Sequence, residues 1–99
     1  MEIFVPVVSV TTFNSWDDLI SRANDTRYGL AAGVWTRDIG KGHRFAQSVQ
    51  ARSVWVNSYG LFDPAAAFGG YKESGFGREM GKVALGLYSQ LKTVWVNTR

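Results

Sequence analysis

The sequence predicts an α/β fold: a largely parallel open sheet whose strands are joined by crossover helices, in the order β-α-β-α-β-loop-α-β. Short runs rich in β-branched residues recur along the chain, and helical patterns of apolar residues separate them. The 99 residues suffice for one domain and are too few for two, so a thin core is expected.

The N-terminal part of the chain predicts a strand followed by a helix. The run PVVSVTTF, at 6–13, is rich in β-branched residues and predicts the strand. Ser15 follows it and is a favourable N-cap residue, while Asp17 and Asp18 complement the dipole of the first turn. Apolar residues then recur at the spacing of an amphipathic helix: Trp16, Leu19, Ile20 and Ala23.

A second strand and helix are expected next. The dipeptide at 28–29 predicts a turn, and the apolar run at 30–35 predicts a strand buried on both faces. Asp38 is a favourable N-cap for a helix over roughly 39–50. Two glycines in its first turns each cost about 1 kcal/mol relative to alanine, so we expect a loose start to this helix.

The remaining elements surround a long irregular segment. A third strand is expected at 53–57, in the run SVWVN, and a last strand at 92–97, in KTVWVN. The segment at 58–77 is rich in glycine, alanine and aromatic residues. Its apolar residues follow neither the helical nor the strand periodicity, which is typical of a functional loop. A helix is expected from Glu79 onward, because apolar residues trace one face there: Met80, Val83, Ala84, Leu87, Tyr88 and Leu91.

Composition excludes several classes of protein. Hydrophobic residues make up 45% of the chain and charged residues 19%, and no apolar run approaches the roughly 20 residues of a membrane span. The N-terminus has an acidic second residue and no basic region, so we expect mature protein from its first residue. The net charge is +3, but lysines and arginines are scattered singly, which argues against a nucleic-acid partner.

The reactive residues offer few sites for chemistry. The chain contains no cysteine, which excludes a disulfide, a thiolate metal site and a cysteine nucleophile among these residues. His43 has no second metal-ligating residue at a suitable spacing, so we expect a solvated surface side chain and no metal site.

The stretch FGGYKESGFGRE, at 68–79, is the strongest candidate for a functional segment. Its glycines precede a predicted helix, as in a dinucleotide-binding turn, but the third glycine of that fingerprint falls on Met80. Ser74 lacks the flanking glycines of a hydrolase elbow. Four charged residues can act as acids and bases or form salt bridges, the second being commoner: Lys72, Glu73, Arg78 and Glu79.

Two phenylalanines in the irregular segment indicate a pocket or a core. Aromatic side chains on a glycine-rich loop are costly to expose. Phe62 and Phe68 therefore either fold into the core or line a concave apolar pocket.

Four motifs occur in order along the chain: EIF followed by Pro6 at 2–6, RANDTRYGLAAGVWTRD at 22–38, VWVNSYGLFDP at 54–64 and FGGYKESGFGREMG at 68–81. Together they resemble the C-terminal part of the aldehyde dehydrogenase superfamily, over essentially the whole chain. The resemblance implies a partial domain, in which 1–91 would be a C-terminal portion of the catalytic domain and 92–99 an oligomerisation strand.

The resemblance also implies a chemistry. Members of the family oxidise an aldehyde to a carboxylic acid with NAD or NADP, through a cysteine thiohemiacetal, hydride transfer, and thioester hydrolysis assisted by a glutamate. That cysteine, that glutamate and the coenzyme domain lie upstream of the matched segment. We therefore expect this chain to be inactive alone and to bind no cofactor by itself.

Individual roles are implied residue by residue. Glu2 would bind the nicotinamide ribose hydroxyls, and Phe4 would pack near the nicotinamide ring. Phe62 and Phe68 would belong to the aromatic wall of the aldehyde pocket. Glu79 would be a carboxylate in a proton path behind the general base.

Assembly and location are implied as well. Lys92 to Asn97 would pair across subunits by strand addition, giving a homo-oligomer, and Arg78 would be a structural residue near that interface. We expect a cytoplasmic protein whose small-molecule partner is an aldehyde.

Three positions depart from the family pattern. Val5 and Arg52 stand where the family has glycine, and Ala67 stands where proline is common. If either glycine position required a positive φ, its replacement would cost on the order of 1 kcal/mol or more.

Two alternatives to an aldehyde dehydrogenase fragment remain open. One is a self-assembling structural or interaction module, because the chain would expose apolar surface and two sheet edges. A weaker alternative is a hydrolase activity built from Lys72, Ser74 and Glu79.

Overall fold

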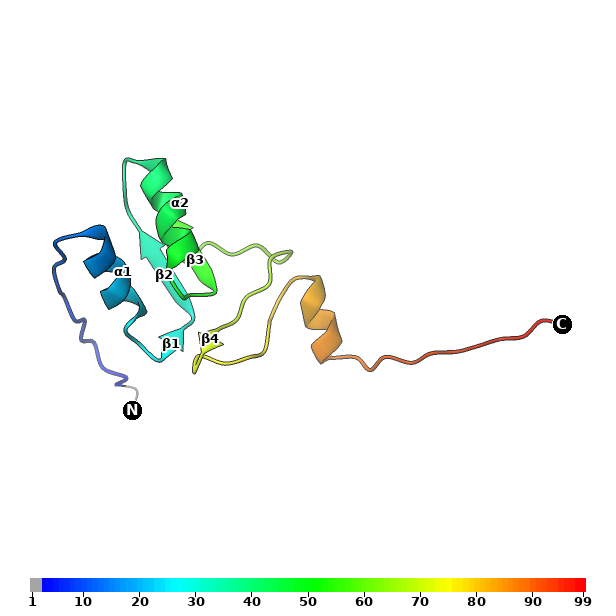
Figure 1. Ribbon diagram of the computed structural model, residues 1–99. Helices are drawn as coiled ribbons and strands as arrows, with labels where there is room; N and C mark the ends of the chain where they lie inside the picture. Colours follow the sequence, from blue (N-terminus) through cyan, green and yellow to red (C-terminus); the bar gives the residue numbers. More distant parts are fainter. Residues whose placement is uncertain (1–2) are drawn as a thin grey trace.

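The chain folds into a small α/β unit from which its C-terminal end extends (Figure 1). The computed structural model describes residues 3–99. Two α-helices, four short strands and one 3₁₀ helix follow one another in that range. They are α1 (Trp16–Asn24), β1 (Tyr28–Gly29), β2 (Ala31–Val34), α2 (Ile39–Ser48), β3 (Ser53–Val56), β4 (Tyr71–Lys72) and the 3₁₀ helix η1 (Lys82–Leu87).

A parallel pair of strands forms the centre of the unit. β2 and β3 pair from Ala31 opposite Ser53 to Val34 opposite Val56, and α2 connects them and packs against β3 (Figure 1). On α2, Phe45 is only 6% exposed. The sequence prediction of two strands joined by a crossover helix is confirmed for this part of the chain. The expected burial of the run at 30–35 on both faces was wrong, because β2 is only half-buried and Leu30 and Trp35 are exposed.

Both α-helices begin where their capping residues predict. Ser15 Oγ accepts a hydrogen bond from the Asp18 amide at 3.1 Å, and α1 starts at the next residue, Trp16. Asp38 Oδ1 accepts from the Lys41 amide at 3.1 Å and caps α2. Each side-chain oxygen satisfies one of the amides that a helix N-terminus leaves without a partner.

The Asp18 carboxylate, in the first turn of α1, links the residue Asn14 before the helix to Arg22 in its last turn. Asp18 accepts hydrogen bonds from Arg22 Nε at 2.7 Å and from the Asn14 amide at 3.1 Å. The bond from Arg22, and secondarily that from Asn14, holds the pKa of the Asp18 carboxyl below its ordinary value of 3.8. A depressed pKa in the folded state means that this stabilisation is present above pH 3.8 and is lost as the pH falls through the lowered value.

The strand predicted at 6–13 is absent, and that prediction was wrong. The segment is exposed, and its only backbone hydrogen bond among the described residues joins the Val7 amide to the Val5 carbonyl at 2.8 Å. β-branched residues favour extended backbone, but a strand also needs a neighbour to complete its ladder. In the first view the segment loops outside α1, away from β2 and β3 (Figure 1).

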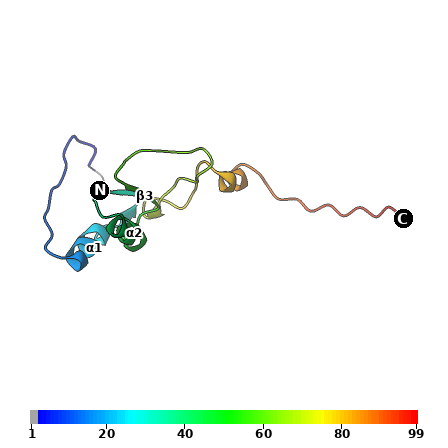
Figure 2. The same cartoon turned by 90° about the horizontal axis from the view of Figure 1, so that it is seen from above.

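The C-terminal elements also differ from the prediction. The helix expected from Glu79 is reduced to η1, because Met80 and Gly81 have φ of +59° and +64°, which right-handed helix does not accommodate. The strand expected at 92–97 is an exposed segment without strand pairing among the described residues. Two views at right angles show it running away from the folded unit (Figure 2).

The open parallel sheet is replaced by two small sheets. Beside the parallel β2–β3 pair, β1 and β4 form an antiparallel pair in which Tyr28 lies opposite Lys72 and Gly29 opposite Tyr71. The predicted turn at 28–29 is therefore a strand, and the segment at 58–77 contributes β4. The fold class, a partial α/β domain, is retained, whereas the largely parallel sheet was wrong for this chain.

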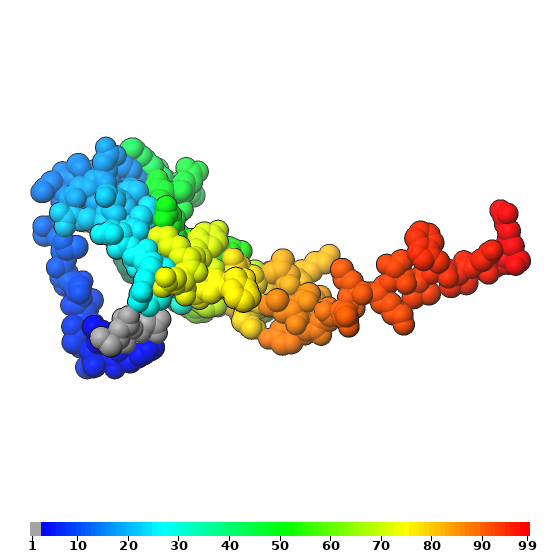
Figure 3. Space-filling model, turned by 60° about the horizontal axis from the view of Figure 1, so that its bottom comes forward, coloured from blue at the N-terminus to red at the C-terminus, as the bar shows by residue number. Residues whose placement is uncertain are grey.

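The molecule is long and its core is small. It measures 72 × 35 × 22 Å, and its radius of gyration is 18.8 Å, compared with about 13 Å for a compact domain of this length. The space-filling view shows the narrow C-terminal extension (Figure 3). Phe45 is the single buried hydrophobic side chain in the described range. No helix in residues 3–99 is both long enough and apolar enough to cross a membrane.

We predict that Gly42→Ala destabilises the chain. A Cβ at position 42 would lie 2.8 Å from Val56 Cγ1, so the contact between α2 and β3 would have to open. Overpacking of this kind costs about 1–3 kcal/mol, which opposes the helix-propensity gain of roughly 1 kcal/mol. The midpoint of urea unfolding should fall relative to the unsubstituted chain.

Gly86→Ala is the matched control, because a Cβ there meets nothing within 4 Å and the residue lies in η1. Its midpoint should stay the same or rise slightly. A Gly42→Ala chain as stable as the Gly86→Ala chain would contradict close packing of α2 on β3.

Candidate functional site

A row of aromatic rings follows β3 into the irregular segment. The ring of Trp55, on β3, lies 4.8 Å from that of Tyr59 and 5.6 Å from that of Phe62, measured between centroids. Phe62 in turn makes an edge-on contact with Phe68, at 5.2 Å and an interplanar angle of 85°. We call Trp55, Phe62 and Phe68 the aromatic wall.

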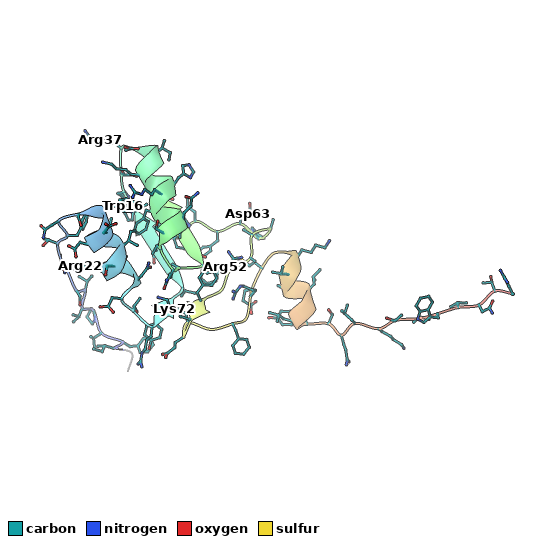
Figure 4. The ribbon with its side chains drawn as sticks, viewed as in Figure 1. Trp16, Arg22, Arg37, Arg52, Asp63 and Lys72 are labelled. Atoms are coloured by element: carbon teal, nitrogen blue, oxygen red, sulfur yellow. The ribbon has the colours of Figure 1, made fainter. Side chains whose placement is uncertain are left out.

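The aromatic wall encloses one side of a shallow cavity. The cavity has a volume of about 180 Å³ and is lined by the three rings together with Ala66, Ala67 and Met80. Trp55 Nε1 donates to the Leu61 carbonyl at 2.8 Å, which fixes the indole relative to the segment that carries Phe62. Asp63, at the far turn of this segment, is labelled in Figure 4.

A reciprocal pair of backbone hydrogen bonds positions Phe68. The Phe68 amide donates to the Glu79 carbonyl and the Glu79 amide to the Phe68 carbonyl, each at 2.7 Å. The Gly81 amide donates to the Pro64 carbonyl at 2.8 Å. The two ends of the stretch at 68–79 are therefore held together beside the cavity.

The glycines of this stretch allow two backbone segments to approach closely. A Cβ on Gly69 would collide with the Gly77 carbonyl, and a Cβ on Gly70 would lie 2.5 Å from Ser74 Cβ. Arg78 bridges the same segments, since its Nη1 donates to the carbonyls of Gly70 at 3.0 Å and Gly77 at 2.7 Å. Arg78 is thus structural, as expected.

Glu79 is held by a tyrosine that the sequence analysis did not select for the site. The Tyr88 hydroxyl donates to both carboxylate oxygens of Glu79, at 3.2 and 3.3 Å. This hydrogen bond, with the negative charge of Glu79, raises the pKa of the Tyr88 hydroxyl above its ordinary value of 10.0. Both residues are exposed, so water reaches the carboxylate.

The three residues of the hydrolase alternative have separate structural partners. Ser74 Oγ accepts from the Gly29 amide at 2.9 Å, and Lys72 Nζ donates to the carbonyls of Asn24 and Thr26 at 3.1 and 3.0 Å. Glu79 instead accepts from Tyr88. No hydrogen bond joins Lys72, Ser74 and Glu79 to one another within residues 3–99, so the geometry gives a hydrolase no support.

Neighbouring charges reinforce the antiparallel β1–β4 pair. Glu73 lies 3.3 Å from Arg27 Nε, and its amide donates to the Arg27 carbonyl at 2.9 Å. Lys72 extends from β4 toward the end of α1 (Figure 4). These contacts join the stretch at 68–79 to the N-terminal half of the unit, so Lys72 and Glu73 have structural partners.

Phe4 and His43 do not line the cavity at the aromatic wall. Phe4 is 89% exposed, and Glu2 lies outside the described residues. His43 is exposed, as expected. Among residues 3–99, no three His, Cys, Asp or Glu side chains gather where they could hold a metal ion.

The three departures from the family pattern are accommodated without left-handed backbone. Non-glycine residues with positive φ in the described range are Asn57, Lys72 and Met80, and do not include Val5, Arg52 or Ala67. Arg52 donates its amide to the Gly29 carbonyl at 3.1 Å. The left-handed strain considered for Val5 and Arg52 is therefore absent from this structure.

Sequence reasoning missed two contributors to the site. Trp55 was assigned only to a strand, yet its ring contacts both Tyr59 and Phe62. Tyr88 was assigned to a helix face, yet it holds Glu79. An aromatic residue on a strand directly before a glycine-rich segment was a usable signal for Trp55, whereas the contact of Tyr88 depends on the left-handed turn at Met80 and Gly81.

The chain is similar to known enzymes. Residues 1–94 match the model of the Aldehyde dehydrogenase family. The chain is 55% identical over 95 residues to a betaine aldehyde dehydrogenase of Brucella anthropi, covering 96% of this chain and 20% of that protein. It is 54% identical to a 4-trimethylaminobutyraldehyde dehydrogenase of Mus musculus, covering 96% of this chain and 19% of that protein.

Solved structures of aldehyde dehydrogenases are also similar to this chain. An aldehyde dehydrogenase from Bacillus cereus in complex with NAD⁺ matches with a TM-score of 0.88 and 54% identity, over 100% of this chain and 20% of that one. A betaine aldehyde dehydrogenase from Staphylococcus aureus, also with NAD⁺, matches with a TM-score of 0.84 and 44% identity, over 89% of this chain and 18% of that one.

The chain belongs to the aldehyde dehydrogenase family. It spans about a fifth of the length of the relatives that it matches. The family resemblance of its motifs is thus confirmed.

We predict that Glu79→Gln lowers the pKa of Tyr88 toward the ordinary tyrosine value. The substitution removes the negative charge that opposes formation of the tyrosinate, while the amide can still accept a hydrogen bond. The Cζ resonance of Tyr88, followed by NMR from pH 8 to about 12 in ¹³C-tyrosine-labelled chain, measures this pKa.

The other three tyrosines serve as internal references, and Glu73→Gln is the matched substitution, since Glu73 pairs with Arg27 and not with Tyr88. Equal Tyr88 titration in the Glu79→Gln and unsubstituted chains would contradict the contact.

Proposed function

We propose that residues 1–91 are a C-terminal portion of the catalytic domain of an NAD(P)-dependent aldehyde dehydrogenase and supply one wall of its aldehyde pocket. The observation that carries the proposal is the edge-on contact of Phe62 with Phe68 on an apolar cavity. Ligand pockets are concave and mostly apolar, with few polar groups that orient the ligand. The family membership supports the same assignment.

The aromatic wall would position the aldehyde without reacting with it. Three rings and small alanines give a surface that packs against the organic part of an aldehyde and excludes water. Because the chain contains no cysteine, the nucleophile of this reaction must come from residues outside these 99. By themselves, these residues therefore provide binding and orientation.

Glu79 would move a proton near this pocket. Its carboxylate is fixed by the Tyr88 hydroxyl, and its backbone is paired with that of Phe68, so it lies on the same short segment as the aromatic wall. An exposed carboxylate next to water can accept a proton and pass it on. Tyr88 would hold the carboxylate in one orientation.

The nicotinamide cofactor would be bound mainly by other residues. When bound, NAD or NADP supplies the hydride acceptor of the oxidation. Phe4, exposed on an extended segment, fits a role in packing on a flat ring. Glu2 would bind ribose hydroxyls, as its carboxylate chemistry permits.

A second candidate function is assembly, in which Lys92 to Asn97 adds to the sheet of another subunit. The segment is extended and has no strand partner within residues 3–99, and it exposes Val94, Trp95 and Val96, at 68%, 92% and 78%. An unpaired extended segment with exposed apolar side chains is suited to edge addition. The edges of the short β2–β3 pair offer a place for such a strand.

The substrate proposal is tested in a chimera. The 99 residues replace the equivalent segment of the Bacillus cereus aldehyde dehydrogenase, whose structure they match closely. The chimera should oxidise aldehydes, and Phe68→Ala in it should raise the KM for an aromatic aldehyde about tenfold or more, since losing a buried ring contact costs about 1.5–3 kcal/mol. The KM for NAD should stay within about twofold.

Phe76→Ala is the matched control, because Phe76 is 100% exposed on the same glycine-rich stretch. It should leave both KM values unchanged. An active chimera in which Phe68→Ala and Phe76→Ala behave alike would contradict the proposed aldehyde wall.

The chain alone provides a simpler test. Incubated with NAD and a panel of aldehydes, it should produce no NADH above the blank, because it has no cysteine to form the thiohemiacetal. Absorbance at 340 nm measures the product. Saturable turnover that survives further purification would show that no cysteine nucleophile is required. It would refute the proposal that these residues only bind and orient the aldehyde.

A further inference from the structure

A second groove lies between α1 and α2, on residues that the aromatic wall does not use. It has a volume of about 480 Å³, and its lining includes Phe13, Trp16, Trp35, Lys41 and Arg44. Figure 4 labels Trp16 on α1, on the side toward α2. The groove shares no lining residue with the cavity at the aromatic wall.

Two cations and an indole form one edge of this groove. The Arg44 guanidinium lies 4.4 Å from the centroid of the Trp16 ring, which is a cation–π contact. Lys41 precedes Arg44 by three residues on α2, so both side chains rise from the same face of the helix. Both side chains line the groove.

Among the residues that the structure describes, no carboxylate forms an ion pair with these cations. Within residues 3–99, the ion pairs are Arg22 with Asp18 and Arg27 with Glu73, so neither Lys41 nor Arg44 has a carboxylate within 4.0 Å. Asp38, the nearest acid in sequence, uses its Oδ1 to cap the Lys41 amide. Of the two acids on α1, Asp18 pairs with Arg22, and Asp17 forms no ion pair among the described residues.

We propose that this groove binds a small planar aromatic carboxylate. A guanidinium that lies over the Trp16 ring can still present N–H groups to a ligand, from which a carboxylate can accept two hydrogen bonds. Lys41 adds a second positive charge, and the apolar rings of Phe13, Trp16 and Trp35 accept the ring of the ligand.

The ligand class follows from the combination of charge and apolar lining. A neutral aromatic ligand would leave the two cations without a partner as it displaced their water, which is unfavourable. A simple inorganic anion would leave the three aromatic rings uncovered. An aromatic ring that carries one carboxylate satisfies both requirements and fits within the volume of the groove.

Titration of the full 99-residue chain with 2-naphthoate tests the site. Each of the four tryptophans contributes one indole N–H signal to a ¹H–¹⁵N NMR spectrum, so the protein carries its own controls. The signals of Trp16 and Trp35 should shift saturably, whereas that of Trp95, which lines neither this groove nor the cavity at the aromatic wall, should not. Phenylalanine substitutions of single tryptophans assign the four signals.

The contribution of charge to ligand binding is tested with a neutral ligand and with variants that remove one cation of the groove. 2-Naphthalenemethanol should bind about tenfold more weakly than 2-naphthoate, and Arg44→Gln should weaken 2-naphthoate by a similar factor. Lys82→Gln removes an exposed charge in η1, outside the groove, and should leave binding unchanged. Lys41→Gln provides a second variant that leaves the Trp16–Arg44 contact intact.

Three results would overturn the proposal. One is the absence of saturable shifts up to millimolar 2-naphthoate. Another is equal affinity for the acid and the alcohol, or for the Arg44→Gln, Lys41→Gln and Lys82→Gln chains. The third is a collapsed indole spectrum before ligand is added, since the groove requires α1 and α2 to be packed as described.

Discussion

The parallel pairing of β2 with β3 is the contact on which the rest of the structure depends. The pairing places α2 over β3, where Phe45 is buried and Gly42 meets Val56. Trp55 lies on β3, where its ring contacts Phe62 of the irregular segment that follows. Because the chain is elongated and has little else in its core, loss of this pair would remove the support of both the aromatic wall and the groove between the helices.

The site itself depends on a smaller constraint, the backbone pairing of Phe68 with Glu79. This pairing closes the glycine-rich stretch into a loop. It holds the backbones of Phe68 and Glu79, eleven residues apart in sequence, side by side in one short antiparallel bridge. Gly69 and Gly70 make this possible because the returning chain passes where their Cβ atoms would be. The glycines thus shape a loop beside a cavity, and no phosphate-binding turn is needed to explain them.

Local signals predicted α1, α2 and the parallel strand pair, whereas the helix expected from Glu79 and the strands that depend on distant partners were mispredicted. Ser15 and Asp38 predicted the starts of α1 and α2, because each capping side chain bonds to an amide only three residues further along the chain. The run at 6–13 has strand composition, but its ladder requires a neighbour that the described chain does not supply. Phe62 and Phe68 were chosen because exposed aromatics on a loop are costly. Trp55 and Tyr88 were missed because their contacts arise only when β3 and the turn at Met80 are in place.

Amide hydrogen exchange at Phe68 and Glu79 tests most directly whether this stretch is a fixed wall. Both amides are in reciprocal hydrogen bonds of 2.7 Å, whereas Phe76, in the same stretch, is fully exposed. We expect Phe68 and Glu79 to exchange at least about tenfold more slowly than Phe76, after correction for intrinsic rates. Exchange of all three at the rate of an unstructured peptide would contradict the account, because the aromatic wall would then have no fixed support.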